Sequence, residues 1–146
     1  MTMPTPLRVP PTPATPSPLP QRIMVVEMMG RYAGWISLHA GIAGGAHAIL
    51  LPEIPFDLGP VVAKIVGRDA IARSYSIVVV AEGARALQGQ RAVLAPAEVG
   101  HAERLGGIGE QVARELAQRT GKDARAVVLG HLLRGGSPTS FDRLAA

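Results

Sequence analysis

The chain lacks cysteine and has few aromatic side chains. None of its 146 residues is Cys, and Phe, Trp and Tyr together make up 3%. The absence of cysteine excludes a disulfide framework, a thiolate metal site and a cysteine nucleophile, and it fits a cytoplasmic protein. The scarcity of aromatic residues leaves Val, Ile, Leu and Ala to fill the core. No apolar run reaches the ~18 residues of a membrane span, so we expect no membrane partner.

Acidic side chains are outnumbered by basic ones. The formal net charge is +4, the pI is about 10.3, and 13 of the 15 basic residues are Arg. A basic chain can bind nucleic acid, but such surfaces normally combine a basic patch with stacking aromatic residues. The arginines of this chain are scattered and its aromatic residues are few. We therefore expect no nucleic-acid partner and favour a small phosphorylated metabolite as the anion.

Residues 1–20 differ in composition from the rest of the chain. They hold eight of the 13 prolines, and Arg8 is their one charged side chain. Such a segment cannot bury apolar surface, so we predict a disordered Pro/Thr-rich leader over 1–20 and a folded domain over 21–146. A transit peptide is less favoured because transit peptides are Arg-rich and amphipathic. The PxxP spacing of Pro10 and Pro13 carries little weight at this proline density.

After residue 20 the sequence alternates between short apolar runs and segments of helical spacing. An alternation of strand and helix predicts an α/β fold with a mainly parallel sheet flanked by helices. Residues 84–105 have no clear period and are predicted to be a surface excursion. The predicted strands are Ile23–Glu27, Ala48–Leu51, Ser76–Ala81 and Ala126–Leu129, and the predicted helices begin at Trp35, Leu58, Gly107 and Phe141. In the first helix, Trp35, Leu38, Ile42 and the small residues between them are expected to form one apolar face.

Polar and glycine residues gather where three of the predicted strands end. Glu27 to Arg31 follow the first strand, Glu82 follows the third, and His131 with Arg134 follow the fourth. Because the carboxyl ends of parallel strands open on one edge of the sheet, we expect these groups to converge there, where ligands bind in open α/β sheets. Arg134 offers a charged fork suited to phosphate, and His131 adds a ring nitrogen donor.

Each of these groups also has a simpler explanation. The glycines around Arg31 could present backbone N–H groups to phosphate at a helix start, or they could merely allow a tight turn. Glu82 could accept hydrogen bonds from sugar hydroxyls, or it could lie in solvent at the start of a loop. No Lys-Ser/Thr pair follows the glycines, no HExxH occurs, and no second ligand stands near His131 at metal spacing. The sequence therefore favours recognition of a phosphorylated ligand and offers no evident general base or metal site.

Four segments of the chain together resemble the second half of the 6-phosphofructokinases, in the bacterial branch that uses ATP or pyrophosphate. The resemblance covers nearly everything after Pro20 and follows the family's order of motifs. The segments are Arg22–Pro52 (RIMVVEMMGRYAGWISLHAGIAGGAHAILLP), Val78–Gly83, Gly107–Gly109 and Ala124–Arg143 (ARAVVLGHLLRGGSPTSFDR). It implies a three-layer phosphofructokinase-like fold, here truncated, and transfer of a phosphoryl group with Mg²⁺ to the 1-hydroxyl of fructose 6-phosphate.

The same resemblance implies a role for eight residues of this chain. Met29, Gly30 and Arg31 would contact the sugar and the transferring phosphate, and Glu82 would hold the fructose hydroxyls. The 6-phosphate would be bound by His131 and Arg134. A homo-oligomer is implied as well, because Arg22 and Arg125 would reach the phosphate of a neighbouring subunit.

The chain also departs from the family pattern. Leu133 stands where the family's His loop usually has Gln, which removes polar capacity but keeps the charged pair. The Gly-Gly-Asp donor loop, the Asp that positions Mg²⁺ and the Thr-x-Asp-x-Asp segment with the catalytic base do not occur in these 146 residues. We therefore expect the chain to hold the fructose 6-phosphate side of the site and to be inactive alone. The alternative is a non-catalytic sugar-phosphate-binding or subunit-interaction module.

Overall fold

A four-stranded parallel sheet forms the centre of the computed structural model, which describes residues 22–71, 75–87, 93–95, 104–137, 139, 140 and 143. The strand order is β2-β3-β1-β6, and every neighbouring pair is parallel. Its strands are β1 (Arg22–Met28), β2 (Ala48–Leu50), β3 (Tyr75–Ala81) and β6 (Asp123–Val128). The β-branched residues that fill β1 and β3 suit such a buried sheet, because parallel strands are covered on both faces.

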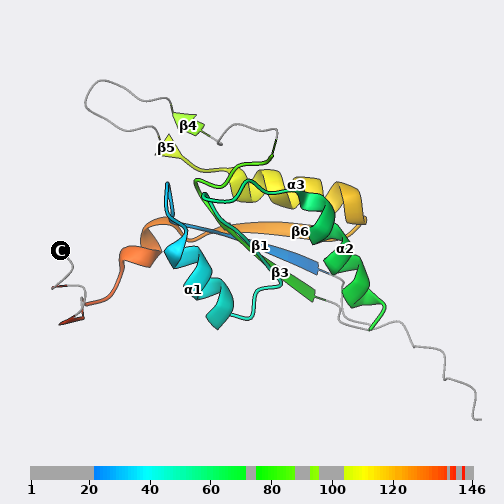
Figure 1. The fold of residues 1–146 in the computed structure, drawn as a ribbon, viewed down its shortest axis with the longest axis horizontal. Helices are drawn as coiled ribbons and strands as arrows, with labels where there is room; N and C mark the ends of the chain where they lie inside the picture. The colour runs from blue at the N-terminus through cyan, green and yellow to red at the C-terminus, as the bar shows by residue number, and fades with distance from the viewer. Residues whose placement is uncertain are drawn as a thin grey trace, which may run out of the picture.

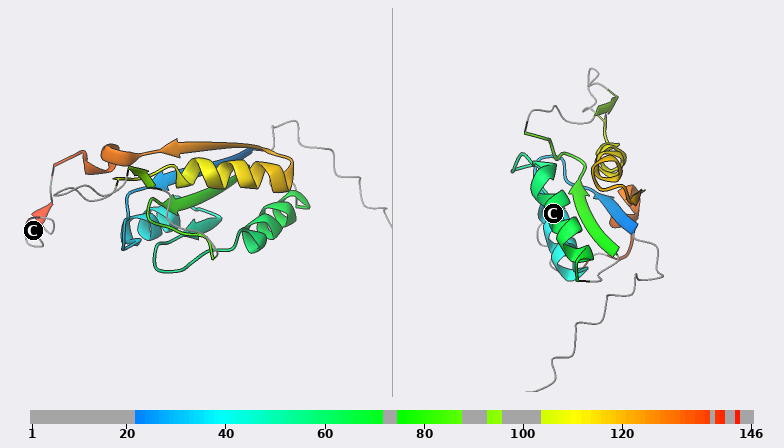
Figure 2. Two further views of the ribbon diagram at one scale, coloured as in Figure 1. Left: turned by 90° about the horizontal axis from the view of Figure 1, so that it is seen from above. Right: turned by 90° about the vertical axis from the view of Figure 1, so that its right-hand side faces the viewer.

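Helices cover the two faces of this sheet, so the molecule has three layers (Figures 1 and 2). Helix α1 (Trp35–Ala43) packs against β2 and β3 on one face, while α2 (Leu58–Asp69) and α3 (Ile108–Thr120) pack against each other and cover the opposite face. The chain crosses from β1 to β2 in one direction and from β3 to β6 in the other, so right-handed crossovers place their helices on opposite faces. The predicted three-layer α/β fold is confirmed.

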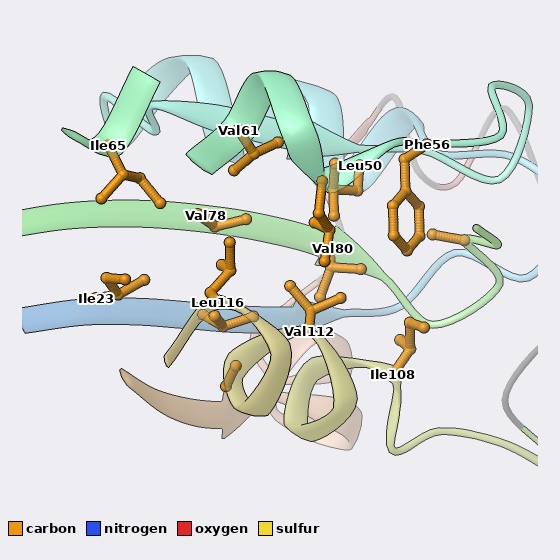
Figure 3. Close-up of a cluster of buried hydrophobic side chains, with 14 residues drawn as sticks. Ile23, Leu50, Phe56, Val61, Ile65, Val78, Val80, Ile108, Val112 and Leu116 are labelled. Atoms are coloured by element: carbon orange, nitrogen blue, oxygen red, sulfur yellow. The ribbon is translucent and has the colours of Figure 1, made fainter. Parts of the chain in front are cut away.

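The main core lies between the sheet and helices α2 and α3 (Figure 3). Ile23 and Val78 point from the strands into this layer and are fully buried. From α3, Ile108, Val112 and Leu116 point into the same layer, and each of these side chains is at most 2% exposed. Four-residue spacing brings the three onto one side of the helix, where they meet the strands.

Helix α1 forms where it was predicted, but of its expected apolar face only small residues are buried, and the prediction is wrong for the large side chains. Trp35 and Ile42 are 66% and 68% exposed, whereas Ser37 and Gly41 are buried. These two small residues, four positions apart, form the side that faces the sheet, and Gly41 lies directly against Ile49. Because the helix lies close to β2 and β3, small side chains such as Ser37 and Gly41 are the ones that fit against the sheet.

Several other elements differ from the prediction. The excursion after β3 contains a short antiparallel pair, β4 (Val93–Ala95) with β5 (Arg104–Leu105). Strand β6 begins at Asp123, and the loop after it forms a 3-10 helix, η1 (Gly130–Arg134). The predicted leader over 1–20 and most of the helix predicted from Phe141 lie outside the described residues. Among the residues that the structure describes, none of the helices has the length and apolar character needed to cross a membrane.

Candidate functional site

The loops that follow β1, β3 and β6 meet at the carboxyl edge of the sheet. Backbone hydrogen bonds join them to one another: Glu82 N donates to Met28 O at 2.9 Å, and Gly83 N donates to Gly30 O at 2.9 Å. On the other side of β1, Leu129 N donates to Glu27 O at 3.0 Å. The central strand thus fixes the position of both neighbouring loops, so the side chains that these loops carry are held in one place.

A cavity of about 510 Å³ opens at this edge. The loop after β1, the loop after β3, the start of α3 and η1 all contribute to its wall. Its lining residues are Glu27, Met29, Arg31, Glu82, Gly106, Gly107, Glu110, Val128, Gly130, His131 and Arg134. We call this cavity the edge pocket.

Five of the eight site residues expected from the sequence line the edge pocket. They are Met29, Arg31, Glu82, His131 and Arg134. The predicted convergence of these side chains is therefore a property of the structure. A sixth, Gly30, lies between two of them, and its carbonyl accepts the hydrogen bond from Gly83.

Arg22 and Arg125 lie away from the edge pocket. Arg22 opens β1 at the amino edge of the sheet, where its register partner is Asp123 on β6. The Asp123 carboxylate joins the two arginines, because its Oδ2 is 3.1 Å from Arg22 Nε and 3.4 Å from Arg125 Nε. Both guanidinium groups remain substantially exposed. Within one chain, these two arginines do not meet the other six residues.

The edge pocket contains groups of both charges. Arg31, His131 and Arg134 supply donors, and Glu27, Glu82 and Glu110 supply carboxylate acceptors. Arginine and histidine can donate charge-assisted hydrogen bonds to phosphate oxygens, while carboxylates accept them from hydroxyl groups. This combination suits a ligand that carries a phosphate at one position and hydroxyl groups at another.

Glu27 was expected at this edge of the sheet but was given no role in the site, and the start of α3 was not expected there. Glu27 is 3% exposed, and its Oε2 accepts a hydrogen bond from Gly109 N at 2.7 Å. Strand alternation could have predicted the burial of Glu27. Ile23, Val25 and Glu27 share one face of β1, and the first two are core residues. Gly106 and Gly107 were read only as the opening of a helix, and their proximity to the loop after β1 depends on how the helix packs.

Among the described residues, no three His, Asp or Glu side chains are grouped closely enough to hold a metal ion by themselves. By the resemblance, the Asp that positions Mg²⁺ belongs to a segment that does not occur in these 146 residues. We derive no step through a metal ion.

Comparison with known proteins identifies the family. The family model described as Phosphofructokinase matches residues 13–146. The chain belongs to the phosphofructokinase family. This confirms the resemblance found in the sequence. The chain is 55% identical over 123 residues to an ATP-dependent 6-phosphofructokinase of Chloroflexus aggregans, and 54% identical over 129 residues to a pyrophosphate–fructose 6-phosphate 1-phosphotransferase of Amycolatopsis methanolica.

The similarity spans most of this chain and a smaller part of each relative. The two alignments cover 84% and 86% of this chain, but 33% and 37% of the respective relatives. Among solved structures, the T-state phosphofructokinase of Pichia pastoris matches with a TM-score of 0.62 and 34% identity, over 90% of this chain and 13% of that chain. The chain thus spans about a third of the length of the bacterial relatives that it matches.

Proposed function

We propose that the edge pocket binds fructose 6-phosphate and that the chain supplies the sugar-phosphate side of a 6-phosphofructokinase site. In this proposal His131 and Arg134 bind the 6-phosphate, and Glu82 accepts hydrogen bonds from the fructose hydroxyls. Met29, Gly30 and Arg31 contact the end of the sugar that receives the phosphoryl group. The observation that carries the proposal is the convergence of Arg31, Glu82, His131 and Arg134, from three separate loops, on one cavity.

The chemistry of phosphoryl transfer supports this division of roles. Such transfer depends mainly on positioning the reactants and neutralising the charge that develops on the phosphate oxygens. The pocket residues can position the acceptor sugar, and Arg31 can help to neutralise the charge on the phosphate oxygens. ATP or pyrophosphate would be the donor, as the names of the bacterial relatives suggest. The cytoplasmic location remains a prediction from the sequence, and the Mg²⁺ requirement a prediction from the resemblance.

We also propose that the chain forms a homo-oligomer in which Arg22 and Arg125 complete the phosphate site of another copy. Their distance from the edge pocket of their own chain and their exposure support this arrangement. Asp123, which pairs with both, would hold the two guanidinium groups side by side for a shared anion.

Calorimetric titration of the chain with fructose 6-phosphate tests the proposal. Arg134→Ala removes a charge-assisted hydrogen bond to phosphate, so the Kd should rise by at least about tenfold. The matched control is Arg119→Ala, which deletes an arginine that pairs with Glu115 on α3 and does not line the edge pocket, and its Kd should stay within about twofold. Absence of binding by the parent chain, or an equal loss in both variants, would contradict the proposal.

The same titration with Arg125→Ala tests the contribution of a second copy. If Arg125 acts between chains, its removal should weaken binding at protein concentrations where sedimentation shows association, and should have no effect on a monomer. A weakening of binding to the monomer would place Arg125 in its own chain's site and contradict the proposed arrangement.

A non-catalytic sugar-phosphate-binding module is the second candidate function. It is favoured by one specific observation, namely that the 146 residues contain the acceptor-side residues but neither the Gly-Gly-Asp nor the Thr-x-Asp-x-Asp segment. Restoration of phosphoryl transfer on co-expression with a phosphofructokinase first half would favour a module that works with a partner.

A further inference from the structure

Glu27 is a buried carboxylate at the wall of a pocket suited to an anion. Only 3% of the residue is exposed, although it lines the edge pocket together with Arg31, His131 and Arg134. A buried charge is costly unless it is paired or hydrogen-bonded. For Glu27 the compensation comes from the backbone of α3, because its Oε2 lies 2.7 Å from Gly109 N.

The contact between Glu27 and α3 requires glycine at position 109. A Cβ added to Gly109 would lie 2.9 Å from the Glu27 Cβ and 3.0 Å from its Oε2. Both distances are shorter than ordinary van der Waals contacts between such atoms, and α3 would have to move away from β1. The second glycine of the Gly107-Ile108-Gly109 segment therefore allows the first turn of α3 to reach the carboxylate.

The position of this carboxylate has an electrostatic consequence. The N-terminus of a helix carries partial positive charge and unpaired N–H groups, and it attracts anions. Gly107 and Glu110, at the start of α3, line the same pocket, so this helix end faces the space where a ligand would bind. Glu27 already occupies it with a negative charge of the protein's own, and Glu110 adds a second carboxylate in the first turn.

We propose that Glu27 is a specificity-determining residue of the edge pocket. Its buried carboxylate closes the N-terminus of α3 to anions, so that a sugar phosphate places its phosphate group at the cations of η1, His131 and Arg134, and not at the helix end. A single phosphate position gives the ligand a single orientation. This inference deepens the proposed function and rests on it for the identity of the ligand, but the closure of the α3 N-terminus can be measured without the sugar.

Glu27→Gln isolates the charge from the hydrogen bond. Glutamine has nearly the same shape, and its side-chain oxygen can still accept from Gly109 N, while its charge is zero. The matched control is Glu115→Gln, which removes one carboxylate from the same helix at a position outside the edge pocket. A general effect of net charge would appear in both variants. An effect of closing the helix end would appear only in Glu27→Gln.

The probe is inorganic phosphate, followed through the backbone amide signals of the labelled chain by NMR. In the parent protein, phosphate should shift the amides of residues 130–135 and leave those of residues 107–110 unchanged. In Glu27→Gln, the amides of residues 107–110 should also shift and saturate, and phosphate should bind about fivefold more tightly, as expected for an anion gaining a helix N-terminus. Glu115→Gln should behave like the parent.

Two results would overturn the inference. One is a phosphate response at residues 107–110 in the parent protein. This result does not depend on whether any variant folds. The other is an unchanged response in Glu27→Gln, or an equal gain in Glu115→Gln. If fructose 6-phosphate fails to bind the parent chain, the proposed function is contradicted, but the comparison of amide signals with inorganic phosphate still decides the role of Glu27.

Discussion

Gly83 shows how a single missing side chain joins two loops of the edge pocket. A Cβ at this position would lie 1.9 Å from the carbonyl oxygen of Arg31, which is a backbone atom and cannot move aside cheaply. Gly83 N also donates to Gly30 O. The loop after β3 can therefore lie directly on the loop after β1, and this contact holds Arg31 and Glu82 in the same pocket.

Gly83→Ala is expected to destabilise the protein by at least about 1–3 kcal/mol, because relieving the clash requires the two loops to separate. Urea denaturation measures the loss in the free energy of unfolding. The matched control is Gly67→Ala in α2, where an added Cβ meets nothing within 4 Å. Alanine favours helix by up to about 1 kcal/mol over glycine, so this variant should be more stable than the parent. A loss of stability in both variants, or in neither, would contradict the proposed steric role of Gly83.

The start of β2 is held to β3 through His47. Its backbone N donates to Ile77 O at 2.8 Å, and its side-chain Nδ1 accepts from Ile77 N at 2.9 Å. The Tyr75 ring contacts the imidazole edge to face, and Arg68 and Lys64 on α2 are the nearby cations. Burial, the Arg68 charge and, more weakly, Lys64 lower the pKa of His47 below 6.5.

This lowered pKa predicts a dependence of stability on pH. Because His47 binds a proton more readily in the unfolded chain, the free energy of unfolding should fall as the pH drops below 6.5 toward the folded-state pKa, and should be fully recovered above 6.5. Protonation of Nδ1 would also remove the acceptor for Ile77 N–H. His47→Asn supplies an oxygen acceptor that does not titrate, so its stability should change less between pH 7.5 and 5.5.

Urea denaturation at a series of pH values, with the parent and His47→Asn in parallel, measures this difference. All other ionisable groups are the same in both proteins and cancel in the comparison. Identical pH profiles would show that His47 does not couple β2 pairing to protonation.

Two polar contacts give Asp57 and Asp69 structural roles at the ends of α2. Asp57 caps α2, because its Oδ1 accepts from Gly59 N at 2.9 Å. Asp69, at the other end of the same helix, pairs with Lys122 in the turn before β6. Both fix helix ends that connect the strands of the sheet, and neither lines the edge pocket.

The chain of 146 residues is expected to transfer no phosphoryl group by itself. Residues that we propose for the acceptor side converge on one pocket, but the sequence contains no Gly-Gly-Asp or Thr-x-Asp-x-Asp segment. An assay with fructose 6-phosphate, Mg²⁺ and either ATP or pyrophosphate should show no turnover, even where titration shows binding. Turnover that disappears in Arg134→Ala would contradict this prediction.

Several large apolar side chains remain exposed on the molecule. Ile36 and Ile42 on α1 are 48% and 68% exposed, and Val127 on β6 is 42% exposed. Exposed apolar surface of this kind is typical of protein–protein contacts. It is compatible with the proposed association of chains, and with the observation that the bacterial relatives are about three times as long as the matched region.

The order of the main elements and the residues at the carboxyl edge could be predicted from the sequence. Apolar runs and four-residue spacing are local properties, so they located β1, β3, α2 and α3 with small errors at the ends. Parallel pairing then required Arg31, Glu82, His131 and Arg134 to open on one edge, and the structure brings them to the edge pocket.

Other features depended on how distant segments pack, and only the tertiary structure decided them. Helix α1 buries Ser37 and Gly41 and exposes Trp35, because its closeness to the sheet leaves room for the small residues alone. Glu27 is buried because Gly109, 82 positions later, lets α3 reach its carboxylate. Composition and periodicity describe each element separately, whereas burial and hydrogen bonding are set by the partner that the fold places beside it.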